Sequence, residues 1–155
     1  MADLVARFHR RPKWIRFGVL AVLGAIAGLG QAPTDLWFIT VLAFALVFAI
    51  YPMAISARQS AFHLWAFGFG YFAFSLRWII EPFLVDIARH GWMAPFALFL
   101  MGAGAALFWA IAGWLAARLA PRSVLMPALV LVGAEALRSL ILTGFPWALV
   151  GHIWV

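Results

Sequence analysis

The chain has no cysteine among its 155 residues and a single lysine, Lys13. Without cysteine, these residues can form no disulfide, no thiolate metal site and no cysteine nucleophile. Charged residues are also scarce, at 10% of the chain, whereas a soluble domain has about 25%. Hydrophobic residues make up 67%. A water-soluble fold of this length could not bury so much apolar surface, so lipid must solvate much of it.

Several classes of binding site are missing from the sequence as well. The four histidines are scattered, with no acidic residue near enough in sequence to suggest a metal site. Gly68 and Gly70 lie within an apolar run without strand context, which argues against a phosphate-binding loop. The net charge is +6, but the basic residues are grouped between apolar runs rather than on a polar face. We therefore expect no metal, no cofactor and no nucleic-acid partner.

Apolar runs separated by short polar breaks dominate what is present. Their lengths are close to the roughly 20 residues that a helix needs to cross a bilayer. The sequence therefore predicts an all-α, polytopic transmembrane helical bundle. Small residues at Gly24, Gly28, Gly68, Gly70 and Gly102 to Ala106 favour close packing of these helices. The five predicted spans cover residues 14–30, 36–51, 61–80, 92–117 and 123–142.

The distribution of basic residues predicts the orientation. Residues 1–13 are rich in arginine, and Arg58, Arg118 and Arg122 lie in the loops expected on the same side. Basic loops remain in the cytoplasm, so the N-terminus is predicted to be cytoplasmic and residues 144–155 to lie outside. Residues 14–155 then form one membrane domain. A cleaved signal peptide ending near Ala25 to Ala27 is the alternative reading of the first apolar run.

Ionisable residues inside membrane helices are candidates for function because they are costly to bury there. His63, Arg77, Glu135 and Arg138 fall within predicted spans. Glu135 and Arg138 are three residues apart and share a helix face, and Arg77 precedes Glu81 by four. Both pairs, Arg77 with Glu81 and Glu135 with Arg138, are predicted to lie near the outer boundary of the membrane, where they could form one polar cluster. Such a cluster is either an inter-helix brace or a site for a lipid headgroup or polar substrate.

The last predicted helix is followed by Gly144, Phe145, Pro146 and Trp147. Glycine and proline end helices, and tryptophan favours the membrane interface. These residues predict a loop that lies along the outer surface.

Three segments together resemble one family. The segment from Phe67 to Asp86, FGFGYFAFSLRWIIEPFLVD, is similar to the glycine- and aromatic-rich third segment of the apolipoprotein N-acyltransferases. The segment from Glu135 to His152, EALRSLILTGFPWALVGH, resembles their Glu-x-x-Arg followed by Thr-Gly-Phe-Pro-Trp. The segment from Leu29 to Trp37, LGQAPTDLW, is similar to their first-hairpin turn. The resemblance covers nearly all of the chain.

The resemblance implies an enzyme of the bacterial inner membrane. Members transfer an acyl chain from a phospholipid to the N-terminal diacylglyceryl-cysteine of an apolipoprotein, the last step of lipoprotein maturation. The family's chemistry uses a Glu–Lys–Cys triad in a periplasmic nitrilase-like domain, and no position here matches its cysteine or lysine. The resemblance therefore gives no catalytic residue in this chain. It gives these candidates for a membrane-side substrate or lipid site: Trp78, Glu81, Glu135, Arg138, Gly144, Phe145, Pro146 and Trp147. Of the matching positions, Tyr71, Trp78 and Glu81 match the family less specifically.

We therefore expect the N-terminal membrane part of an apolipoprotein N-acyltransferase, without the nitrilase-like domain and inactive by itself. A phospholipid donor, an apolipoprotein acceptor and the bilayer are its expected partners. The alternative is a small standalone membrane protein, such as a scaffold or a transporter subunit. A channel is less consistent with the sequence, because the charged residues cluster near one membrane face rather than at its centre.

Overall fold

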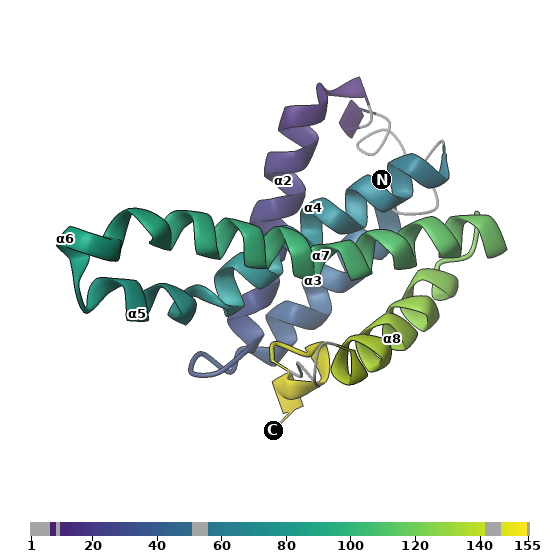
Figure 1. Ribbon diagram of the computed structural model, residues 1–155. Coiled ribbons are helices and arrows are strands. Elements are labelled where there is room, and N and C mark those ends of the chain that lie inside the picture. Colours follow the sequence, from purple (N-terminus) through teal and green to yellow (C-terminus); the bar gives the residue numbers. More distant parts are fainter. Residues whose placement is uncertain (1–6, 9, 51–55, 142–146, 155) are drawn as a thin grey trace.

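The computed structural model describes residues 7–8, 10–50, 56–141 and 147–154, and every regular element in this part of the chain is a helix (Figure 1). Five longer helices form the bundle, joined by short α- and 3₁₀-helical turns. Their bounds are α2 (Lys13–Ala27), α3 (Trp37–Ile50), α4 (Ala57–Ser75), α7 (Ala94–Leu119) and α8 (Leu125–Leu140). The shorter elements are η1 (Gly28–Gly30), η3 (Arg77–Ile80), α5 (Glu81–Leu84), α6 (Ile87–His90), η4 (Gly91–Met93) and η5 (Val150–Trp154).

Helix α4 is the centre of the bundle and packs against both α2 and α7. Nine of its 19 residues are buried. The predicted close approach of helices is confirmed where α2 crosses α4. A Cβ at Gly24 would overlap the backbone carbonyl of Phe67, and one at Gly70 would overlap that of Ala21. Glycine at both positions lets the two backbones touch.

Aromatic rings fill the space between α4 and α7. Trp109 of α7 is fully buried and lies against Phe67, Tyr71 and Phe72, with ring centroids 5.0 to 5.7 Å apart. Phe44 of α3 closes the group at 5.5 Å from Trp109. Gly68 faces the Trp109 ring, so the indole lies directly on the α4 backbone. Offset and edge-on ring pairs of this kind add about 0.5–1.5 kcal/mol each beyond their buried area.

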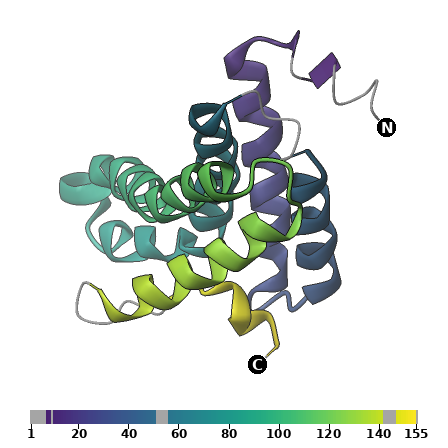
Figure 2. The ribbon, with the colours of Figure 1, turned by 90° about the vertical axis from the view of Figure 1, so that its right-hand side faces the viewer.

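The C-terminal segment turns back beneath the bundle. Helix α8 packs on α7, and η5 reaches the beginning of α3. There the ring centroids of Trp37 and Trp154 are 5.1 Å apart. Figure 2 shows this segment below α8 and beside α3. The fold thus brings residues 147–154 next to the turn that joins α2 to α3.

A helix is present in each of the five predicted spans, but the number of membrane crossings is supported only in part. Two helical stretches, Lys13–Gly30 and Ile87–Leu119, are long and apolar enough to cross a bilayer, and Trp37–Ile50 is a shorter apolar helix. Helix α8 has 16 residues and is roughly 24 Å long at 1.5 Å per residue. That is less than the roughly 30 Å of a bilayer's apolar core, so the figure of five crossings stays a prediction.

The boundaries of α4 differ from the prediction at both ends. The helix begins at Ala57 rather than Ala61, because the Ser56 side chain accepts a hydrogen bond from the Gln59 amide at 3.2 Å and caps it. It ends at Ser75, and the chain continues into η3 and then α5 and α6. These short helices lie at one end of α7, beyond the rest of the bundle (Figure 1).

Candidate functional site

Glu135 and Arg138 form a buried ion pair on α8. Arg138 Nη2 lies 3.0 Å from Glu135 Oε2, and Arg138 Nε donates to Oε1 at 3.3 Å. The Arg138 side chain is 2% exposed and that of Glu135 is 13% exposed. The predicted pairing of these two residues is therefore confirmed, with two-point geometry. Such planar pairs are the strongest of the charge-assisted hydrogen bonds in proteins.

Trp109 supplies a further partner for the acid. Its indole Nε1 donates to Glu135 Oε1 at 2.8 Å, so α7 and α8 are joined through this carboxylate. Arg138 also lies over the Phe72 ring, with its Cζ 4.9 Å from the ring centroid. A buried tryptophan N–H requires an acceptor, and a buried carboxylate requires donors, so each satisfies the other.

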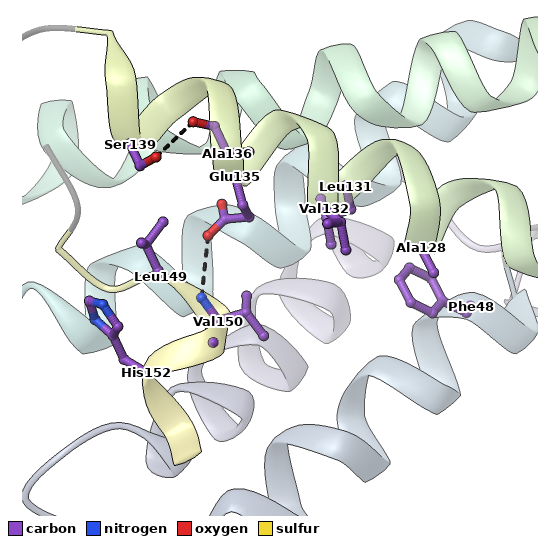
Figure 3. Close-up of a pocket in the computed structure, with 11 residues that line it drawn as sticks. Phe48, Ala128, Leu131, Val132, Glu135, Ala136, Ser139, Leu149, Val150 and His152 are labelled. Carbon is purple, nitrogen blue, oxygen red and sulfur yellow. Dashed lines mark hydrogen bonds between the residues drawn. The ribbon is translucent and has the colours of Figure 1, made fainter. Parts of the chain in front are cut away.

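The same residues hold the backbone of the C-terminal segment. Arg138 Nη1 donates to the Trp147 carbonyl at 2.9 Å, and Nη2 is 3.4 Å from the Ala148 carbonyl. The Val150 amide donates to Glu135 Oε2 at 3.3 Å (Figure 3). Three of the four residues from Trp147 to Val150 therefore bond to this ion pair through their backbone.

Gln31 binds the remaining residue of this segment, Leu149. It lies in the turn between α2 and α3, and its Nε2 donates to the Leu149 carbonyl at 2.9 Å and to the Tyr71 hydroxyl at 2.6 Å. We call Gln31, Trp109, Glu135 and Arg138 the polar clamp. It fixes residues 147–150 directly to α8 and to the turn between α2 and α3, and Trp109 of α7 supports it through Glu135. Ala148, in the middle, has φ of 53°, a left-handed conformation that a residue other than glycine adopts at a cost.

The clamp determines where Trp147 lies. The Trp147 ring is edge-on to Trp78 of η3, with centroids 4.9 Å apart and planes at 71°. Both rings are partly open to the surroundings, with Trp78 42% and Trp147 48% exposed. Two of the predicted site residues, far apart in sequence, therefore form one exposed aromatic pair above the buried ion pair.

An apolar cavity of about 510 Å³ lies on the other side of Glu135, between α8, α3 and the C-terminal segment (Figure 3). Phe48 and Leu131 form its apolar wall, and Ser139 and His152 lie at its edge. The Ser139 hydroxyl donates to the Ala136 carbonyl at 2.7 Å, so its proton is already used. The cavity has the size of an ordinary ligand pocket but offers few polar groups.

The prediction that Arg77 and Glu81 form one cluster with Glu135 and Arg138 is wrong. Arg77 is exposed, donates to the Phe74 carbonyl at 3.0 Å and lies over the Phe74 ring. Glu81 is exposed, and both line a second cavity that Glu135 and Arg138 do not reach. The reason is the break after Ser75: η3 and α5 turn away from α4 and carry Arg77 and Glu81 with them.

The predicted site residues thus fall into three groups. Glu135 and Arg138 form the ion pair, and Trp78 and Trp147 form the aromatic pair above it. Glu81 lines the second cavity with Trp78. Gly144, Phe145 and Pro146 lie outside the described residues. Among those described, no group of three or more metal-ligating side chains is present.

Sequence reasoning missed Gln31 and Trp109 as parts of the site. A signal for Trp109 exists, because a tryptophan in a membrane helix needs an acceptor and Glu135 is the single acid within the predicted spans. Gln31 had no comparable signal, since a polar residue in a turn is ordinary. Chemically, the Glu135 carboxylate accepts four hydrogen bonds, so it is suited to holding structure rather than to taking a proton.

Comparison with known proteins gives one family. Residues 23–155 match the family model described as the apolipoprotein N-acyltransferase N-terminal domain. The chain is 40% identical over 154 residues to the apolipoprotein N-acyltransferase of Caulobacter vibrioides, covering 96% of this chain and 29% of that protein. It is 34% identical over 165 residues to that of Brucella suis, covering 98% and 31%. It is 36% identical over 148 residues to that of Rhodopseudomonas palustris, covering 90% and 27%.

These relatives are all longer than the chain, which spans less than a third of the length of each. The matched region nevertheless includes the whole polar clamp and both rings of the aromatic pair. The chain belongs to the apolipoprotein N-acyltransferase family and corresponds to that family's N-terminal domain.

Proposed function

We propose that this chain is the N-terminal membrane part of a phospholipid-dependent acyltransferase. Its whole protein transfers an acyl chain from a phospholipid to the N-terminal diacylglyceryl-cysteine of an apolipoprotein. The observation that carries this is the match of residues 23–155 to the N-terminal domain of the family. The chain has no cysteine, so an acyl thioester of the kind the family uses must form on residues beyond these 155. We accordingly propose that the chain alone does not transfer acyl groups.

We propose a positioning role for the polar clamp in this reaction. Glu135 and Arg138 hold the backbone of residues 147–150, and the segment in turn carries Trp147 to its place beside Trp78. The exposed indole pair is suited to contact lipid chains or headgroups at the outer interface, where tryptophan is favoured. The buried charges thus act through the segment that they hold, and the two exposed rings are the part available to substrates.

The proposed location is the bacterial inner membrane, with the N-terminus in the cytoplasm and residues 144–155 on the periplasmic side. Two features support it. The arginines of the N-terminal segment and of the loops at 58, 118 and 122 fall on one side by the positive-inside rule. The apolar helical stretches Lys13–Gly30 and Ile87–Leu119 are suited to crossing the bilayer.

A chimera tests the proposed function. Residues 1–155 would replace the matching 29% of the Caulobacter protein, and the fusion would be assayed for N-acylation of a diacylglyceryl lipopeptide with phospholipid present. We expect acyl transfer by the chimera and none by the 155 residues alone. A chimera that inserts into membranes and remains folded but does not acylate the lipopeptide would contradict the proposal. So would turnover by the 155 residues alone above that of empty membranes.

A further inference from the structure

An apolar groove runs between α3 and α8, along the cavity of about 510 Å³ beside Glu135. Its α8 wall is formed by Ala128, Val132 and Ala136, which are four residues apart and so lie on one face of the helix. Phe48 of α3 lies opposite Ala128 (Figure 3). We call this hollow the α3–α8 groove. It is open to the surroundings, because Val132 lines the cavity and is nevertheless 69% exposed.

Each wall of the groove carries an exposed apolar face. Among the long helices that the structure describes, α8 packs extensively on α7 alone, and it exposes both Leu129 and Val132. On α3, Ala45 and Val41 are exposed and precede Phe48 by three and seven residues, so they continue the face that Phe48 presents to the groove. Adjoining exposed apolar faces of this kind mark a surface that packs against another element.

Two polar groups inside the groove are already paired. The Glu135 carboxylate accepts hydrogen bonds from the Trp109 indole and the Val150 amide. The Ser139 hydroxyl donates to the Ala136 carbonyl. Neither group requires a polar ligand, so the groove suits an apolar occupant. A membrane helix is such an occupant, because its backbone polar groups are satisfied within the helix.

The C-terminal segment lies at the end of the groove where α8 ends and α3 begins. Gly151 and His152 line the cavity there, and the Trp154 ring lies against that of Trp37. Residues that follow Trp154 in a longer polypeptide therefore start beside this end of the groove. Because α8 runs toward this end, a helix that starts here and returns through the bilayer is antiparallel to α8. Neighbouring helices joined by short connections have this arrangement.

We propose that the α3–α8 groove is the docking surface for the first membrane helix that follows residue 155 in the same polypeptide. This docking surface rests on the proposed function, in which the chain is the N-terminal part of a longer protein, as in relatives of which it spans less than a third. The helix lies over Ala128, Val132 and Ala136, and its large apolar side chains fill the cavity as ridges pack into grooves. Gly133, where an added Cβ would meet no atom within 4 Å, leaves the α8 backbone open to a close approach.

Cysteine cross-linking in the chimera tests the docking surface, because residues 1–155 contain no cysteine of their own. One cysteine is placed in the groove, at Ala45, Ala128, Val132 or Ser139. A second is moved through about 25 residues after position 155, enough for one membrane span. Mild oxidation in membranes joins cysteines that are close together, and mass spectrometry of the digested protein identifies the joined peptides. Val22→Cys is the matched control, because Val22 is an exposed apolar residue of α2 outside the groove.

We expect Val132→Cys to cross-link to positions three or four residues apart in the following segment. The yield should exceed that of Val22→Cys by about tenfold or more, because segments held together react at millimolar or higher effective concentration. Ala45→Cys should react at the same depth from the other side of that helix. Ala128 and Ser139 are 11 positions apart on α8. Since the two helices are antiparallel, Ala128→Cys should react about 11 residues farther along the segment than Ser139→Cys.

Three results would overturn the docking surface. They are a Val132→Cys yield no higher than that of Val22→Cys, reactive positions without helical spacing, and cross-links that join Val132→Cys of two copies of the protein. Acyl transfer is measured on the same samples. An active chimera without the expected cross-links overturns the docking surface alone, whereas an inactive chimera with them contradicts the proposed function alone. Co-expression of residues 1–155 and the Caulobacter remainder as two polypeptides repeats the measurement, so that the result does not depend on the junction of the chimera.

Discussion

Arg138 Nη1 donates a hydrogen bond to the backbone carbonyl of Trp147 at 2.9 Å, although the two residues are nine positions apart along the chain. This bond joins the end of α8 to the segment that follows it, across residues 142–146. It makes the buried charge of α8 a determinant of where an exposed indole lies.

Replacing Arg138 with methionine should strongly destabilise the fold. The substitution leaves the Glu135 carboxylate buried without its cation, and breaking a buried pair in this way costs about 3–5 kcal/mol. The measurement is the free energy of unfolding in detergent, by denaturant titration. Arg118→Met is the control, because Arg118 is exposed and contacts the Trp114 ring, and its loss should cost under about 1 kcal/mol. Equal losses in the two variants would show that the pair is not important for stability.

The Trp109→Phe variant should distinguish how much the hydrogen bond to Glu135 contributes to the free energy of unfolding from how much ring packing contributes. Phenylalanine keeps much of the aromatic contact with Phe67 and Tyr71 but cannot donate to Glu135. Leaving a buried acceptor short of one donor costs about 1–3 kcal/mol, in addition to a smaller loss of packing. In the same unfolding titration, Trp114→Phe on the exposed side of α7 should be nearly neutral. A neutral Trp109→Phe would argue against the hydrogen bond between α7 and α8.

Gly70→Ala should disrupt the crossing of α2 and α4, because its Cβ would overlap the Ala21 carbonyl. Overpacking of this kind costs about 1–3 kcal/mol. Gly104→Ala is the matched control in α7, where no atom lies within 4 Å of the added Cβ. Since alanine favours a helix over glycine, the control should be neutral or stabilising. Thermal unfolding in detergent compares the two, and the reverse order of midpoints would contradict the close crossing.

Gln31→Leu should loosen residues 147–150 without breaking the ion pair. The Leu149 carbonyl and the Tyr71 hydroxyl both lose a donor, at a cost of about 1–3 kcal/mol. Hydrogen–deuterium exchange at the Val150 amide, which donates to Glu135, is expected to become faster. Thr34→Ala, in the same turn, removes an exposed hydroxyl that bonds only locally and serves as the control. Unchanged exchange at Val150 in the Gln31 variant would place Gln31 outside the clamp.

The sequence was sufficient to predict the helices and the ion pair. Apolar runs bounded by proline, glycine and polar residues gave the approximate position of each long helix. The three-residue spacing of Glu135 and Arg138 predicted their pairing. These features depend on local sequence, so they could be recognised without knowing the fold.

The partners of the pair depend on the fold and could not be predicted in the same way. Trp109 is 26 residues from Glu135, and Gln31 is 118 residues from Leu149. Glycine contacts, such as that of Gly24 with the Phe67 backbone, decide which helix faces pack together. The spacing of residues in the sequence does not show which face a given helix packs against. The separation of Arg77 and Glu81 from the clamp has a similar origin, because it follows from the turn at η3 rather than from helical periodicity.

The most direct test of the clamp's role is the acylation rate of the chimera that carries residues 1–155 ahead of the remainder of the Caulobacter protein. We predict that Arg138→Met lowers kcat by about 100-fold, because a misplacement of roughly 1 Å that originates far from the chemistry can cost this much. Arg138→Lys should recover part of the loss. Trp147→Ala should raise KM more than it lowers kcat. A chimera whose Arg138→Met variant is present at normal levels and acylates at the unmodified rate would contradict a positioning role for the clamp.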